Sequence, residues 1–225
     1  MAARKNLTLE DFERVGAGYT EEGKWEPYCI FPVYYPFRAC TTEPMVTYYQ
    51  GRAYLEETVP GKRFPGRHDV EFGMGHQYFW HPDYNPREAK VIIVVESVLN
   101  VLSLVRIFEE KSVDDPIAPV CVFKSGITTE QCIRLRDECE QAEEFCFLFD
   151  HDATRKADEA ATRLRHLNTT RTYTVAQMPD TCGPKTDPND DAEAALQAIL
   201  KRRRFRPIKW QRAQTPATAS PGHPR

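Results

Sequence analysis

The stretch that decides the fold lies near the middle of the chain and reads Val91-Ile92-Ile93-Val94-Val95-Glu96-Ser97. An unbroken run of β-branched apolar residues is typical of a strand that is covered on both faces, as in a parallel sheet. Residues 97–111 follow with apolar side chains near helical spacing. The pattern therefore predicts a buried strand that leads directly into a covering helix, with an acidic residue between them.

The same alternation continues downstream. Further apolar strands are predicted at 120–123, 145–149 and 171–176. Helices are predicted at 128–142, at 155–167, and from near Pro188 into the arginine run. Strands and helices that alternate at this spacing predict an α/β fold with a parallel four-stranded sheet and right-handed crossovers. Strands predicted at 28–34 and 45–54 make residues 1–89 a smaller α+β unit in front of it.

The composition limits the protein class. The chain has 225 residues, of which 41% are hydrophobic, so it can build one ordinary domain or a domain with a smaller one attached. No apolar run approaches the length of a membrane span, and the N-terminus lacks the apolar region of a signal peptide. Seven cysteines with no CxxC pair predict reduced thiols rather than a disulfide or zinc framework. We expect a cytoplasmic protein with no membrane partner.

Charge is distributed unevenly along the chain. Residues 90–200 carry 12 Lys and Arg residues against 20 Asp and Glu residues, whereas residues 201–225 carry 8 against none. Cations interleaved with Phe205 and Trp210 favour contact with a nucleic acid, through phosphates and stacked bases. The alternative is a helix C-terminus that favours cations and runs into a solvated tail at 205–225. The candidate phosphate contacts here are Arg202, Arg203 and Arg204.

Acidic residues follow the predicted strands at matching positions. Glu96 ends the first strand, Asp150 and Asp152 end the third, and Asp187 lies beyond the fourth. Ligands of doubly wound sheets bind beyond the carboxyl ends of the strands, so these side chains are expected to converge at one edge. Asp150 and Asp152, two apart in an extended chain, would project to the same side.

A group of carboxylates at one edge predicts a divalent cation. The four side chains would repel one another without one, and oxygen ligands suit Mg²⁺ or Mn²⁺. Glu96, Asp150 and Asp152 are the candidate catalytic residues, and Asp187 joins them as a metal ligand. Each residue also has a structural explanation when taken singly. Asp187 before Pro188, for example, is a good helix N-cap.

Residues 90–199 resemble the Toprim domain, the catalytic core shared by bacterial-type primases, type IA and type II topoisomerases and several nucleases. The resemblance rests on four segments in order: Val91–Asn100, Phe123–Gln131, Phe149–Ala157 and Lys185–Asp190. They correspond to the family's glutamate, its small-residue turn, its Asp-x-Asp motif and its downstream Asp-Pro segment. The resemblance implies a Toprim fold over 90–204, including the C-terminal helix, and a metal-dependent activity on nucleic acid.

The upstream half is similar to the segments that precede this domain in DnaG-type primases, namely Val15–Tyr19, Ile30–Val33 and Gln50–Arg52. Residues 1–89 would then be a primase N-terminal-like subdomain. The resemblance implies that Arg52 contacts template or nucleotide phosphate, and Lys124 and Lys185 are expected to act as further electrostatic clamps. Lys124 is equally well explained as a solvated turn residue.

The chain departs from the family pattern at several positions. Ser97 replaces a glycine, Gln77 a lysine, and Asn100 and Asn189 replace acids. An asparagine can still offer a carbonyl oxygen to a cation but contributes no charge, so a second ion should bind more weakly.

These features predict a magnesium-dependent DNA primase, a nucleotidyltransferase that makes short primers on single-stranded DNA from nucleoside triphosphates during DNA replication. The zinc-binding and helicase-binding segments of complete primases are not recognised, so a helicase or a separate zinc-ribbon protein is an expected partner. Two alternatives keep the same fold. One is a Toprim nuclease that cleaves nucleic acid, and the other is a non-catalytic relative that only binds DNA.

Overall fold

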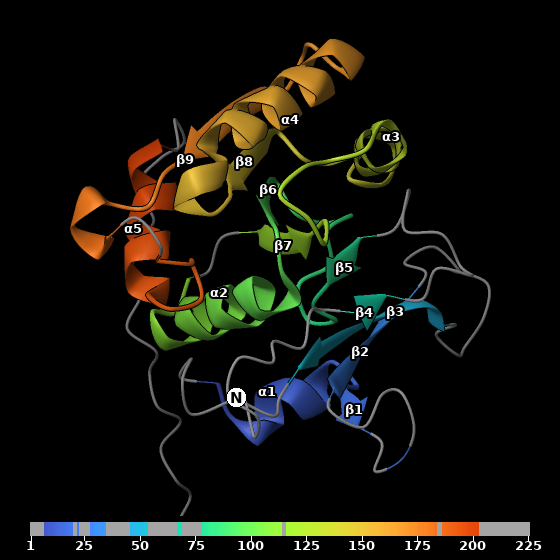
Figure 1. Cartoon of the computed structure of the whole chain (residues 1–225). Coiled ribbons are helices and arrows are strands. Elements are labelled where there is room, and N and C mark those ends of the chain that lie inside the picture. Colours follow the sequence, from blue (N-terminus) through green and yellow to red (C-terminus); the bar gives the residue numbers. More distant parts are fainter. Residues whose placement is uncertain are drawn as a thin grey trace, which may run out of the picture.

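The computed structural model describes residues 7–19, 22, 28–34, 46–53, 67–68, 78–113, 116–183 and 186–202 (Figure 1). The helices are α1 (Leu9–Arg14), α2 (Val98–Glu110), α3 (Thr129–Glu138), α4 (Thr154–Leu167) and α5 (Ala192–Arg202), with short 3₁₀ turns η4 (His151–Ala153) and η5 (Asp180–Cys182). The strands are β1 (Gly18–Tyr19), β2 (Tyr28–Tyr34), β3 (Val46–Ala53), β4 (Arg67–His68), β5 (Phe79–Trp80), β6 (Val91–Val95), β7 (Ile117–Cys121), β8 (Glu144–Leu148) and β9 (Thr172–Ala176). The tail predicted at 205–225 lies outside the described residues.

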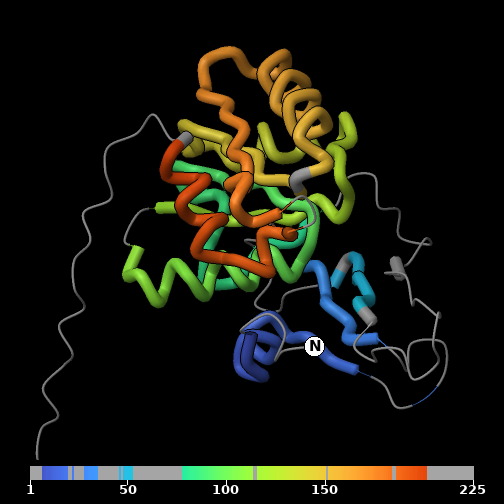
Figure 2. Tube along the Cα trace, turned by 60° about the vertical axis from the view of Figure 1, so that its left-hand side comes forward, coloured from blue at the N-terminus to red at the C-terminus, as the bar shows by residue number. Residues whose placement is uncertain are grey.

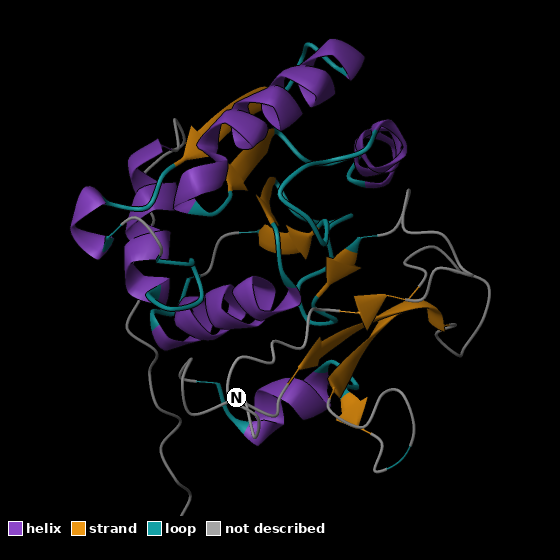
Figure 3. Ribbon diagram, in the orientation of Figure 1, coloured by secondary structure: helices purple, strands orange, loops and turns teal. Residues whose placement is uncertain are grey.

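The chain has a mixed α/β architecture with two sheets (Figure 3). The larger sheet has the strand order β5-β7-β6-β8-β9, and all of its pairs are parallel except β5 with β7. The four predicted parallel strands are therefore confirmed. The fifth strand was not predicted, because Phe79–Trp80 is too short to show a periodic pattern.

Alternate residues of β6 face two different apolar layers. Val91, Ile93 and Val95 belong to the core cluster that includes α2 and α5, whereas Ile92 and Val94 belong to the cluster that includes α3 and α4. Figures 1 and 2 show these two pairs of helices on opposite faces of the sheet. All five residues of β6 are buried, as the apolar run predicts for a strand covered on both sides.

Two predicted boundaries are wrong for local reasons. The strand predicted at 120–123 begins at Ile117 instead. β7 tolerates Pro119 because its neighbour β5 is short and pairs only with Val120 and Cys121. The last helix begins at Ala192 rather than near Pro188. Asp191 supplies its N-cap, since the Asp191 Oδ1 accepts a hydrogen bond of 2.9 Å from the Ala194 amide.

The upstream part forms the smaller antiparallel sheet, in the order β1-β2-β3-β4, with α1 beside it. The predicted strands at 28–34 and 45–54 are β2 and β3. Their apolar residues Phe31, Val33 and Tyr48 share one core cluster with α2. An apolar cluster thus crosses residue 89, and the division into 1–89 and 90–204 stays a prediction.

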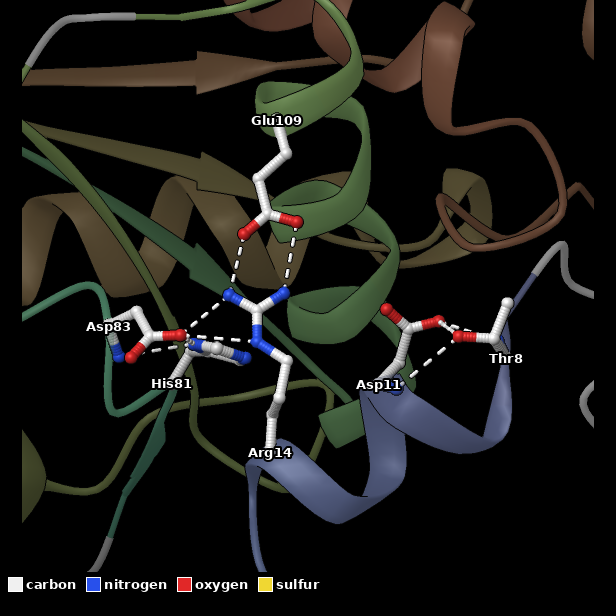
Figure 4. Close-up of polar contacts among 6 residues, drawn as sticks. All are labelled: Thr8, Asp11, Arg14, His81, Asp83 and Glu109. Atoms are coloured by element: carbon white, nitrogen blue, oxygen red, sulfur yellow. Dashed lines mark hydrogen bonds and ion pairs between the residues drawn. The ribbon is translucent and has the colours of Figure 1, made fainter. Parts of the chain in front are cut away.

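Ion pairs also connect the upstream part of the chain to α2 (Figure 4). Arg14 at the end of α1 reaches Asp83, after β5, and Glu109, near the end of α2, each with an N–O distance of 2.6 Å. On the preceding turn of α1, Asp11 accepts a hydrogen bond of 3.1 Å from Arg106. We call Arg14, Asp83 and Glu109, with the adjacent pair of Asp11 and Arg106, the Arg14 cluster. It fixes α1 along α2.

None of the described helices combines the length and the apolar character needed to cross a membrane.

Candidate functional site

The direction in which the chain adds strands to the larger sheet reverses between β6 and β8. The chain leaves β6 for β7 on one side, and it leaves β8 for β9 on the other. In sheets of this kind the helices diverge at such a point and open a crevice beyond the carboxyl ends of the two strands. Glu96 directly follows β6, and Asp150 comes shortly after β8. Both residues therefore stand at the crevice that the topology predicts for a ligand.

A hydrogen bond joins these two strand ends. The Asp150 amide donates to the Glu96 Oε1 over 3.0 Å. The neighbouring strand is tied in as well, because the Cys121 thiol donates to the Glu96 carbonyl oxygen over 3.3 Å. The Glu96 carboxylate is thus held at the junction of three strands, with its backbone and side chain each engaged.

Neighbouring acidic groups act on Glu96. Burial raises the pKa of its carboxyl group, and the negative charges of Asp187 and Asp152 raise it further. The hydrogen bond from the Asp150 amide and the positive charge of Lys156 lower the pKa but do not cancel the rise. The charges of Asp152 and Asp187 thus act on Glu96, and Asp150 meets Glu96 through its backbone amide. We call these four residues the carboxylate rim.

The local geometry of the Asp-x-Asp motif differs from the prediction. The argument from an extended chain is wrong, because residues 151–153 form the 3₁₀ turn η4 in front of α4. The Ala153 amide donates to the Asp150 carbonyl oxygen over 2.8 Å and closes this turn. Asp152 is exposed and Asp150 is half-buried, and both still lie at the carboxyl end of β8.

Asp187 does not serve as a helix cap. Since Asp191 caps α5, the structural explanation that the sequence offered for Asp187 is wrong. The Asp187 Oδ1 instead accepts a hydrogen bond of 3.3 Å from the Asn189 amide within a turn. This turn holds the half-buried Asp187 close enough to Glu96 for its charge to act there.

The two asparagines that depart from the family pattern contact each other. The Asn189 Nδ2 donates to the Asn100 Oδ1 over 2.6 Å, and both side chains are buried. The Asn100 Oδ1 also accepts from the Ser97 hydroxyl over 3.4 Å, so both of its hydrogen-bond partners lie within the protein.

Two lysines flank the rim. The Lys156 Nζ, in the first turn of α4, donates to the Ser125 Oγ over 2.6 Å. Lys124 is the exposed neighbour of Ser125 in the loop after β7. Sequence reasoning did not select Lys156, although a lysine in the first turn of a helix opposes the helix dipole and was a usable signal.

The loop after β7 has a strained start. Phe123 adopts a φ of 67°, which a bulky side chain rarely does. Its ring packs on Tyr48 of β3 with the ring centroids 5.3 Å apart. Ser125, two residues further on, accepts the hydrogen bond from Lys156 in the first turn of α4.

The predicted phosphate contacts are only partly described. Arg52 of β3 is half-buried. Burial raises the pKa of the Cys121 thiol to about 12, and the positive charge of the nearby Arg52 acts in the opposite direction. Arg52 therefore lies near Cys121, whose thiol donates to the Glu96 carbonyl oxygen at the carboxylate rim. Lys185, Arg203 and Arg204 lie outside the described residues, and the Arg202 side chain at the end of α5 is not described either.

The donor chemistry of the rim fits a hard divalent cation, since all four side chains offer carboxylate oxygens. Across the described ranges, however, no three His, Cys, Asp or Glu side chains stand close enough together to hold one ion jointly. Coordination of Mg²⁺ therefore requires carboxylates such as Glu96 and Asp152 to rotate from the positions seen here. Asp152 is exposed and can rotate freely.

No family model, curated protein or solved structure matches this chain. The resemblance to Toprim proteins accordingly rests on the residues of the chain itself.

Proposed function

We propose that the protein is a magnesium-dependent nucleotidyltransferase of the Toprim type, which joins nucleoside triphosphates into short primers on single-stranded DNA. One observation carries the proposal: the Asp150 amide bonds to the Glu96 carboxylate at the β6–β8 crevice. Asp152 and Asp187 lie within electrostatic range of the same carboxylate.

The rim residues would divide the work. Glu96, Asp150, Asp152 and Asp187 would hold a Mg²⁺, and the ion would supply charge stabilisation for a triphosphate that loses pyrophosphate. In the alternative division, Glu96, whose pKa is raised by burial, would not bind the ion but would accept the proton of the attacking hydroxyl at its carboxylate. The positive charge of Lys156 acts on Glu96, and Lys156, with Arg52 and Lys124, would contact phosphate oxygens.

A synthesis assay tests the proposal. The full chain is incubated with single-stranded template, labelled nucleoside triphosphates and Mg²⁺, and the products are resolved by length. Labelled products longer than the input nucleotides support the proposal. Glu96→Gln should abolish them, whereas Glu130→Gln, a matched change at an exposed glutamate in the first turn of α3, should not.

Other outcomes would replace the proposal. A shortened template would assign the rim to phosphodiester cleavage instead of synthesis. DNA binding without any Mg²⁺-dependent product would overturn the catalytic assignment and leave a DNA-binding protein.

The predicted contribution of the basic C-terminal segment can be tested separately. Deletion of residues 203–225 leaves the described part of α5 intact and should weaken binding to single-stranded DNA. Each lost phosphate contact should reduce the slope of log K against log salt by about 0.7. An unchanged affinity and salt slope would show that residues 203–225, with Arg203 and Arg204, do not bind DNA.

A further inference from the structure

A buried pair of amides joins the start of α2 to the turn that carries Asp187. The Asn100 side chain has no exposed surface, and that of Asn189 is 3% exposed. The Asn189 Nδ2 donates to the Asn100 Oδ1 over 2.6 Å, across 89 residues of sequence. On the helix side, Asn100 is fixed in turn by Ser97, the N-cap of α2, whose Oγ accepts from the Asn100 amide over 3.4 Å.

This pair is connected to Asp187 through the turn at 187–190. The Asn189 amide donates to the Asp187 Oδ1 over 3.3 Å, and the Asp190 amide donates to the Asp187 carbonyl oxygen over 2.8 Å. Pro188, between them, is buried. Two hydrogen bonds thus close the turn at Asp187, and the Asn189 side chain attaches that turn to the first turn of α2, shortly after Glu96 and β6.

The chemistry of the pair suits this place. A donor and an acceptor satisfy each other without charge, which matters beside a rim that already gathers four carboxylates. Two acids in the same buried positions would add repulsion to a group in which Glu96 already has a raised pKa.

We propose that Asn100 and Asn189 are positioning residues that hold Asp187 at the carboxylate rim, and that neither is a ligand of the ion. The inference rests on the proposed function only in that a divalent cation binds the rim. Residues that orient metal ligands from outside the coordination sphere typically change metal affinity by about 10- to 100-fold when they are replaced.

A purely structural amide pair would behave differently. It would stabilise the fold, but its loss would leave the affinity of the folded protein for the ion unchanged. If the pair acts through Asp187, its removal must have no effect once the Asp187 carboxylate is gone.

The test is a double-mutant cycle read by Mn²⁺ titration calorimetry on the full chain. Asn189→Ala should raise the Mn²⁺ dissociation constant about 10-fold. Asp187→Asn should raise it at least as much, and the double variant should match Asp187→Asn alone. Asn168→Ala is the control, because Asn168 lies just past the far end of α4 from the rim.

Three results would overturn the inference. One is an Asn189→Ala protein that melts at a lower temperature but binds Mn²⁺ as tightly as the wild type. Another is a pair of effects that add in the double variant. The third is wild-type protein that binds no Mn²⁺, which would rule out the metal site and the proposed function with it. The first two results would instead rule out only the role of the amide pair.

A second variant protects the test against misfolding. Asn100→Leu removes the acceptor from the helix side at similar volume. It also removes the Asn100 Nδ2, which is buried without a hydrogen-bond partner among the described residues. This variant should show the same loss of Mn²⁺ affinity and the same lack of additivity with Asp187→Asn.

Discussion

The Arg14 cluster and the carboxylate rim both contain acidic side chains from distant parts of the chain, but they differ in how the negative charge is neutralised. In the Arg14 cluster each carboxylate meets an arginine. Asp83 and Glu109 meet Arg14 (Figure 4), and Asp11 meets Arg106. At the rim, the Glu96 carboxylate accepts a hydrogen bond from the Asp150 backbone amide, and Lys156 donates to the Ser125 hydroxyl.

The pKa shifts show the same contrast. The hydrogen bonds from Arg14 to Glu109 and Asp83 raise the pKa of Arg14 further above its ordinary value, so its charged form is favoured by folding. Burial and neighbouring acids raise the pKa of Glu96, so its charged form is disfavoured by folding. A balanced cluster is what a structural joint needs, whereas an unbalanced one is expected where a positively charged ligand completes the site.

The largest expected difference between the two clusters is in activity. Asp150→Asn with Asp152→Asn should lower Mg²⁺-dependent product formation by about 1000-fold, since it removes two negative charges and replaces two carboxylates by weaker amide ligands. The fold should remain intact or become more stable as repulsion is relieved. Initial rates of primer synthesis at fixed Mg²⁺ measure this effect.

The matched pair of substitutions in the Arg14 cluster is the control. Asp83→Asn with Glu109→Gln also neutralises two carboxylates, but it should leave the rate of synthesis unchanged. Equal losses of activity in the two double variants would erase the distinction between the clusters.

The next effect is on stability. Arg14→Met should lower the free energy of unfolding by about 1 kcal/mol, because it leaves Asp83 and Glu109 without their shared cation at a partly exposed site. Urea unfolding at low and high salt measures the loss, which should shrink as salt screens the ion pairs. A variant as stable as the wild type at low salt would show that α1 is held by apolar packing alone.

The smallest effect concerns pH. Because the pKa of Glu96 is raised in the folded state, its contribution to stability is fully present below the unfolded pKa and is lost as pH rises through the folded pKa. Glu96→Gln removes this loss and keeps an oxygen for the Asp150 amide. The variant should therefore gain stability over the wild type as pH rises.

Urea unfolding in metal-free buffer across this pH range checks the sign. A gain that stays constant with pH, or that grows as pH falls, would contradict the raised pKa.

Long apolar runs made most of the α/β fold predictable. Val91–Val95 and the helix after it appear where the pattern places them, because a strand buried on both faces needs apolar residues throughout. Phe79–Trp80 escaped prediction because two residues carry no periodicity, and β7 was shifted because prolines usually interrupt strands.

The position of the candidate site at the strand ends was predictable, but its internal contacts were not. Strand ends located Glu96 and Asp150, since topology alone brings them together. The choice of Asp191 over Asp187 as the α5 cap depends on where the turn before the helix ends, which a run of neighbouring acids does not reveal. The bond between Asn100 and Asn189 joins side chains 89 residues apart and follows only from the packed structure.

The most direct test of the carboxylate rim is a crystal of the full chain soaked in Mn²⁺ and examined by anomalous diffraction. The account predicts one strong anomalous peak at the β6–β8 crevice, coordinated by oxygens of Glu96, Asp150, Asp152 or Asp187, with the Arg14 cluster empty of metal. A crevice without a peak under saturating Mn²⁺, or a peak bound only elsewhere, would contradict it.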